Sequence, residues 1–116
     1  MDNIKDDKYR IDRILKDINF VIDILKNLSL KEFEENEVVC DSVCFRFIQM
    51  SENASKISKV FIEKYKDIPI YQLKGIRNRI VHDYGNVDMS IVYNTVKCDL
   101  RIFREKLTNV LELIVC

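Results

Sequence analysis

Glycine and proline are scarce in this sequence, which has two glycines and one proline. The chain therefore has few of the residues that form tight turns between strands, and this argues against a β-sandwich or a β-barrel. No apolar run reaches the roughly 18 to 20 residues that span a bilayer, and the acidic N-terminus has no apolar segment typical of a secretory signal. We therefore expect no membrane-spanning segment and a cytoplasmic location.

Net charge is also absent, because 19 Lys and Arg balance 19 Asp and Glu. This balance argues against a protein that coats nucleic acid through a large basic surface. The charges are unevenly placed, however. Residues 1–41 have eleven acids and seven bases, a net charge of −4, whereas residues 42–116 have twelve bases and eight acids, a net charge of +4. Residues 71–82 contain three bases and no acid, so they form a candidate anion-binding segment.

Side chains that bind transition metals are few: the sequence has four cysteines and one histidine. Cys40 and Cys44, four residues apart, would share one face of a helix, and Cys98, Cys116 or His82 would have to complete a zinc site. We favour the alternative, in which the cysteines are reduced thiols that pack as small hydrophobic residues. The sequence therefore predicts no metal site and no cofactor.

Apolar residues recur every three to four positions through most of the chain, which is the spacing of amphipathic helices. The first such stretch covers residues 11–28. Ser29 and Glu32 then have the spacing of a capping box, which predicts the start of a short helix. Asn36 is placed to cap a long third helix that extends to about Lys66.

The second half of the sequence predicts two further helices. Pro69 suits the first turn of a helix from about Ile70 to Tyr84, because its missing N–H would have no partner there in any case. Asp88 is placed to cap the last helix. No linker or repeat interrupts the pattern, so we predict an all-α fold, an antiparallel bundle of four to five helices, in a single domain over residues 1–116.

The densest group of chemically useful side chains falls in the fourth of these helices. Its members are the cations Lys74, Arg77 and Arg79, the amide of Asn78, the imidazole of His82 and the phenol of Tyr84. Arginine and histidine are the residue types that cleave RNA without a metal. A neutral imidazole can accept the proton of a ribose 2′-OH, and a guanidinium can bind the phosphate and stabilise the charge of the transition state.

One chain has difficulty in completing this chemistry alone. On a regular helix Arg77 and His82 would point about 140° apart, and a single histidine cannot easily be both general base and general acid. A twofold homodimer would supply a second histidine. Phe20 and Ile24 lie off the main apolar stripe of the first helix and fit such an additional interface. The alternative is that Arg77 and His82 are ordinary surface residues.

The segment around these residues resembles the HEPN superfamily, and specifically the HepT-like toxins. The family signature is Arg-x4-His-x-Tyr with an asparagine after the arginine, and the matching residues are Arg77, Asn78, His82 and Tyr84. Residues 48–58 are also similar to a helix of that family, except that Ser51 stands where glycine is usual and Asn53 where a small residue is usual. Ile70 and Tyr93 stand where tryptophans are often found.

The resemblance implies a metal-independent endoribonuclease toxin of a type VII-like toxin–antitoxin pair, with its active site at the interface of a homodimer. It implies that Arg77 binds the phosphate and stabilises the transition state, and that His82 is the general acid or base. Asn78 would orient His82 or bind the phosphate. Lys74 and Arg79 are candidate RNA contacts. Residue Glu52 would line the dimer cleft or form a salt bridge inside the bundle.

The expected partner, also implied by the resemblance, is a MntA-type nucleotidyltransferase antitoxin that transfers AMP to Tyr84. The added group is anionic and bulky, and it would oppose RNA phosphate by repulsion two residues from His82. Two other functions fit the sequence. The chain could be a non-catalytic helical partner, or nucleotide-binding subunit, of a nucleotidyltransferase, or a structural four-helix module in which the motif is incidental.

Overall fold

The structure is a computed structural model that describes residues 4–115, without the side chains of Ile4, Tyr84 and Val115. Every regular element in this range is helical, which confirms the predicted all-α class. The elements are α1 (Ile4–Leu25), α2 (Leu30–Glu35), α3 (Glu37–Ser55), α4 (Lys59–Lys64), α5 (Ile70–His82), the 3₁₀ turn η1 (Tyr84–Asn86), α6 (Met89–Asn94), the π-helical turn η2 (Thr95–Asp99) and α7 (Leu100–Val115).

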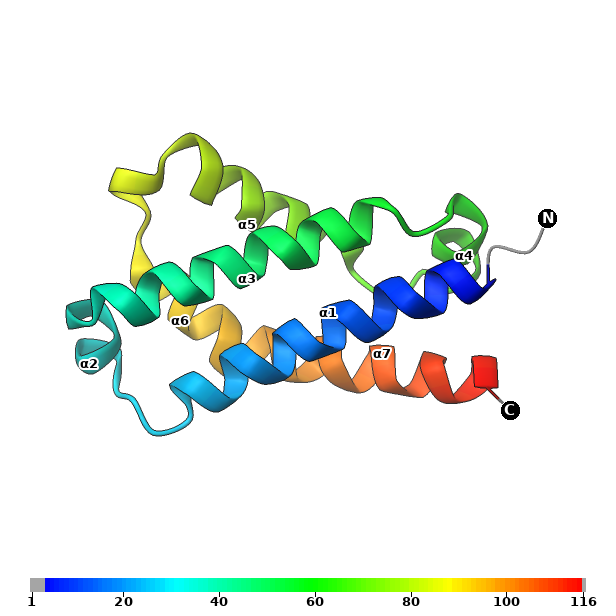
Figure 1. The fold of residues 1–116 in the computed structure, drawn as a ribbon, viewed down its shortest axis with the longest axis horizontal. Helices are drawn as coiled ribbons and strands as arrows, with labels where there is room; N and C mark the ends of the chain where they lie inside the picture. Colours follow the sequence, from blue (N-terminus) through cyan, green and yellow to red (C-terminus); the bar gives the residue numbers. More distant parts are fainter. Residues whose placement is uncertain (1–3, 116) are drawn as a thin grey trace.

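Long antiparallel helices form the bundle (Figure 1). Helix α1 packs against both α3 and α7, whereas α5 packs mainly against α3 and lies at the edge of the bundle. The N-terminal and C-terminal ends of the described chain lie together at one end of the bundle with α4, and the C-terminal end of α5 lies at the other end with α2 (Figure 1). No helix in residues 4–115 is long and apolar enough to cross a membrane.

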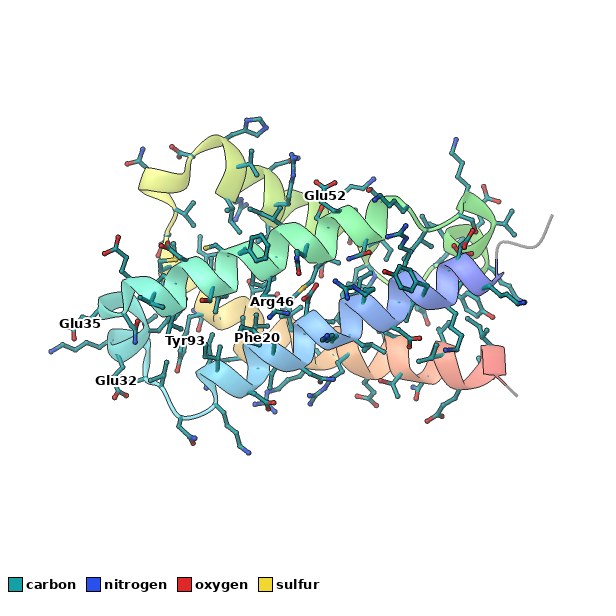
Figure 2. The ribbon with its side chains drawn as sticks, in the orientation of Figure 1. Phe20, Glu32, Glu35, Arg46, Glu52 and Tyr93 are labelled. Carbon is teal, nitrogen blue, oxygen red and sulfur yellow. The ribbon has the colours of Figure 1, made fainter. Side chains whose placement is uncertain are left out.

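The predicted apolar stripe of the first helix is fully buried. Side chains with no exposed surface in α1 are Ile11, Ile14, Ile18, Val21 and Leu25. Phe20 and Ile24, which the sequence leaves off that stripe, are partly buried against the same core. The guanidinium carbon of Arg46 lies 3.8 Å from the centre of the Phe20 ring (Figure 2). Packing within one chain therefore explains these two residues, and they give no support to a dimer.

Side chains of α6 and of the π-helical turn η2 bind the C-terminal end of α1 and the residues that follow it. The Tyr93 hydroxyl donates to the carbonyl of Leu28 at 2.7 Å, and the Lys97 ammonium donates to the carbonyl of Leu25 at 2.7 Å. Carbonyls at a helix C-terminus have no partner within their own helix. The Leu25 carbonyl also accepts from the N–H of Leu28 at 3.2 Å, so Lys97, in the π-helical turn, is a second donor to it.

All three predicted N-caps are confirmed. Ser29 and Glu32 form a reciprocal capping box, and hydrogen bonding to the backbone N–H of Ser29 lowers the pKa of Glu32. The side chain of Asn36 accepts from the N–H of Val39 at 3.1 Å. Asp88 accepts from the hydroxyl and the N–H of Ser90, and these hydrogen bonds lower the pKa of its carboxyl.

The predicted long helix from Asn36 to Lys66 is wrong, because α3 ends at Ser55 and a separate short helix follows. Ser58 caps that short helix, α4, by accepting from the N–H of Phe61. The buried carboxylate of Asp7, in α1, accepts from the N–H of Ser58 at 2.8 Å and from its hydroxyl at 2.6 Å. A side chain 51 residues away thus fixes the break.

The last two predicted helices also differ in their details. Helix α5 ends at His82 rather than at Tyr84, because Asp83 leaves helical geometry and a 3₁₀ turn begins. Asn86 closes that turn: its N–H donates to the Asp83 carbonyl at 2.9 Å, and its side-chain amide donates to the Asp83 carboxylate at 3.0 Å. The segment after Asp88 is not one regular α-helix, since the π-helical turn interrupts it.

The cysteines within the described residues are free thiols. Cys40 and Cys44 are buried in α3, and the Cys40 thiol donates to the carbonyl of Phe33 at 3.1 Å. Burial raises the pKa of Cys44 to about 11, so its thiol stays protonated and packs as a small apolar group. Cys98 is exposed, and Cys116 lies outside the described residues. The described part of the chain contains no group of three or more His, Cys, Asp or Glu side chains that could hold a metal ion.

Candidate active site

Helix α5 presents the motif because one of its faces is anchored on the bundle. Its buried side chains are Ile70, Leu73 and Ile80. The helix begins at Ile70, directly after Pro69, as predicted. The face that carries Lys74 and Asn78 is exposed. Solvent can therefore reach the motif along the outer side of the bundle.

Arg77 lies on the flank of α5 that faces α3. One guanidinium nitrogen, Nη2, is 3.6 Å from Oε1 of Glu52, and the other, Nη1, donates to the side-chain oxygen of Asn78 at 3.2 Å. Figure 2 shows Glu52 on the side of α3 toward α5. Of the two readings of Glu52 from the sequence, the ion pair inside one chain is therefore found. Asn78 hydrogen-bonds Arg77 in this structure.

His82 is the last residue of α5, and its side chain is exposed. Five residues separate it from Arg77, which rotates it by about 140° around the helix, away from α3. Arg79, three residues before His82, lies on the same flank and is exposed as well. Within one described chain, the base next to His82 on the helix surface is therefore Arg79, whereas Arg77 is turned toward Glu52.

Tyr84 follows the helix, and its backbone begins the 3₁₀ turn η1. Its side chain lies outside the described residues, so the structure does not test its predicted modification. The turn places this residue beyond the regular geometry of α5, two residues after His82.

The acid-free segment 71–82 has acids near it in space. Glu52 comes from α3, and Asp83 follows directly after α5. The sequence alone does not pair Glu52 with Arg77, because 25 residues and a short helix separate them. Glu52 and Arg77 lie on facing flanks because α3 and α5 pack together. The spacing of residues within each helix does not reveal that packing.

Comparison with known proteins agrees with this geometry. The family model described as Ribonuclease HepT-like matches residues 14–110, a range that includes the whole of α5 and most of the bundle. No solved structure matches the chain.

Several curated relatives carry ribonuclease names. "Putative RNase MJ1216" of Methanocaldococcus jannaschii is 28% identical over 85% of this chain and 82% of its own length. "Putative RNase MJ0125" of the same organism is 27% identical over 85% of both chains. "Putative RNase TTE0752" of Caldanaerobacter subterraneus is 22% identical over 88% of this chain and 91% of its own length. The all-α bundle, the exposed motif helix and the match to the family model together show that this chain belongs to the HepT-like ribonuclease family of the HEPN superfamily.

Proposed function

We propose that the chain is a metal-independent endoribonuclease whose active site forms between two copies. The observation that carries the proposal is the Arg-x4-His sequence at the free end of α5, where a partly exposed Arg77 and an exposed His82 lie on opposite flanks of one helix. Both residue types suit phosphodiester cleavage at neutral pH. Neither needs a metal to act.

Each residue has a distinct role in this proposal. His82 accepts the proton of the ribose 2′-OH, and the resulting oxygen attacks the neighbouring phosphorus. The bond from phosphorus to the 5′-oxygen breaks, a 2′,3′-cyclic phosphate forms, and the 5′-oxygen takes a proton from a second acid. Arg77 binds the non-bridging oxygens and stabilises the charge of the transition state. Asn78 holds the Arg77 side chain in place, and Lys74 and Arg79 contact the RNA beside the cleaved bond.

A homodimer would supply both a general base and a general acid, two roles that the single histidine of one chain cannot easily fill together. The reaction needs a base at the 2′-oxygen and an acid at the 5′-oxygen, and the sequence has one histidine. A twofold axis near the end of α5 brings two copies of His82 to one RNA strand, the first as base and the second as acid. It also presents two copies of Arg77, which converge on a phosphate from separate helices.

Purified protein incubated with RNA tests this function. We expect cleavage that persists in excess chelator and leaves 2′,3′-cyclic phosphate ends, which mass spectrometry of the products detects. A 2′-deoxy substitution at the cleaved nucleotide should block the reaction, because it removes the nucleophile. Stable association with a nucleotidyltransferase and no cleavage at any dose would instead favour the non-catalytic partner.

We also propose that this ribonuclease is the toxin of a toxin–antitoxin pair, neutralised by a nucleotidyltransferase that adds AMP to Tyr84. An AMP group there would add negative charge and bulk two residues from His82 and repel the RNA backbone. Co-expression with such a transferase should add one or more AMP masses to the peptide that contains Tyr84, and growth inhibition should stop. Neutralised protein whose Tyr84 peptide is unmodified would contradict this part of the proposal.

A further inference from the structure

A pocket of about 310 Å³ lies between the C-terminal half of α5 and helix α6. Its walls are apolar and come from both helices and the segment between them; they include Ile80, Val87, Ile91 and Val92. Ligand pockets usually measure roughly 300 to 1,000 Å³. This one is at the small end of that range. Its size suits a small planar ligand better than a helix of a partner protein.

The pocket lies next to the motif. Arg79 lines it, and Arg79 precedes His82 by three residues, so the two side chains are neighbours on the surface of α5. Asp83 lines the same pocket and directly follows His82 in the chain. A group bound at His82 would therefore lie close to Arg79 at the pocket.

The polar rim carries both hydrogen-bond donors and acceptors. Arg79 contributes a guanidinium, while Asp83 and Asp88 contribute carboxylates. The side chain of Asn86 donates to one Asp83 oxygen at 3.0 Å and so fixes that carboxylate in place. Two carboxylates disfavour a phosphate in this position. A neutral group with acceptors on one edge and a donor on another fits the rim better.

We propose that this pocket binds one nucleobase of the RNA substrate beside the cleaved phosphate, and that guanine is the preferred base. The inference rests on the proposed ribonuclease function and adds its base specificity. Guanine offers O6 and N7 as acceptors for the Arg79 guanidinium and an exocyclic amine as a donor to the Asp83 carboxylate. The apolar walls contact the faces of the ring.

Cleavage of a random RNA pool, followed by sequencing of the product ends, tests the pocket. Wild-type protein should prefer guanine at one position beside the cleaved bond by about tenfold, the discrimination typical of a bidentate base contact. Ile91 lines the pocket and its side chain is 44% exposed, so Ile91→Trp can fill the pocket without disturbing the core. We expect it to reduce the preference below about threefold while RNA is still cleaved.

Val60→Trp is the matched control, because Val60 is an exposed residue of α4 that does not line the pocket. Its base preference should equal that of the wild type. A wild-type enzyme without base preference would overturn the proposal, and so would a preference that survives Ile91→Trp. If Ile91→Trp dissociates the dimer but leaves the preference intact, the pocket is a protein interface, and the proposal is wrong.

Binding of uncleavable RNA separates this proposal from the proposed function. The test uses four oligonucleotides, each with a 2′-deoxy nucleotide at the cleaved position and a different base beside it. Each is titrated against the wild-type and Ile91→Trp proteins. If the wild type cleaves no RNA but binds the guanine oligonucleotide most tightly, the nuclease function fails and the pocket stands. Equal binding of all four by the wild type rejects the pocket whether or not RNA is cleaved.

Discussion

His82→Ala is expected to lower the rate of RNA cleavage by about 10²- to 10⁴-fold, the usual contribution of a positioned general acid or base. No other histidine in the chain can replace it, since the sequence has only one. The side chain is exposed at the end of α5, so its removal leaves no cavity in the core. Single-turnover cleavage rates at saturating protein measure the effect.

The fold and the assembly state are controls for this variant. Helical circular dichroism and sedimentation should be unchanged in His82→Ala. Tyr71→Ala is a matched control on the same helix, because Tyr71 is 73% exposed and lies three turns from His82. It should cleave RNA at the wild-type rate. Wild-type cleavage by His82→Ala would reject His82 as the general acid or base.

Mixed dimers show whether both histidines serve one reaction. When wild-type and His82→Ala chains exchange freely in equal amounts, about a quarter of the dimers contain two intact chains. If base and acid come from different copies, activity should fall to about a quarter of the wild-type value. If each chain acts alone, about half should remain. The latter result would contradict a reaction that uses the histidines of both copies.

Local helix signals predicted much of the fold. The buried stripe of α1 and the caps at Ser29, Asn36 and Asp88 all follow from residues close together in the sequence. Hydrophobic periodicity and cap chemistry act over one or two helical turns, which makes them readable in a single sequence. The start of α5 after Pro69 belongs to the same class.

Features that depend on tertiary contacts escaped prediction. The helical rhythm of apolar residues continues through Met50, Ala54, Ile57 and Phe61, and all four are buried, although the helix breaks between α3 and α4. Nothing near Ser58 reveals that Asp7 will bind it. The pairing of Arg77 with Glu52 escaped prediction for the same reason.

Arg77→Ala is expected to lower RNA cleavage by about 10²- to 10³-fold, the effect of removing one donor that stabilises charge in a transition state. Arg77→Lys should recover only part of the loss, because an ammonium cannot bind phosphate through two parallel hydrogen bonds. The contact of Arg77 with Glu52 raises a second explanation, in which the arginine acts only by tethering α5 to α3. Single-turnover rates and urea unfolding, measured on the same preparations, distinguish the two.

Glu52→Gln decides between these explanations. The ion pair is long, at 3.6 Å, and the Glu52 side chain is 55% exposed, so the pair contributes at most about 1 kcal/mol to the free energy of unfolding. RNA phosphate can therefore displace Glu52 at little cost. If Arg77 acts on RNA, Glu52→Gln should change cleavage by less than about fivefold, because 1 kcal/mol corresponds to roughly that factor. A loss as large as that of Arg77→Ala would mean that the tether, and not a phosphate contact, is what the arginine provides.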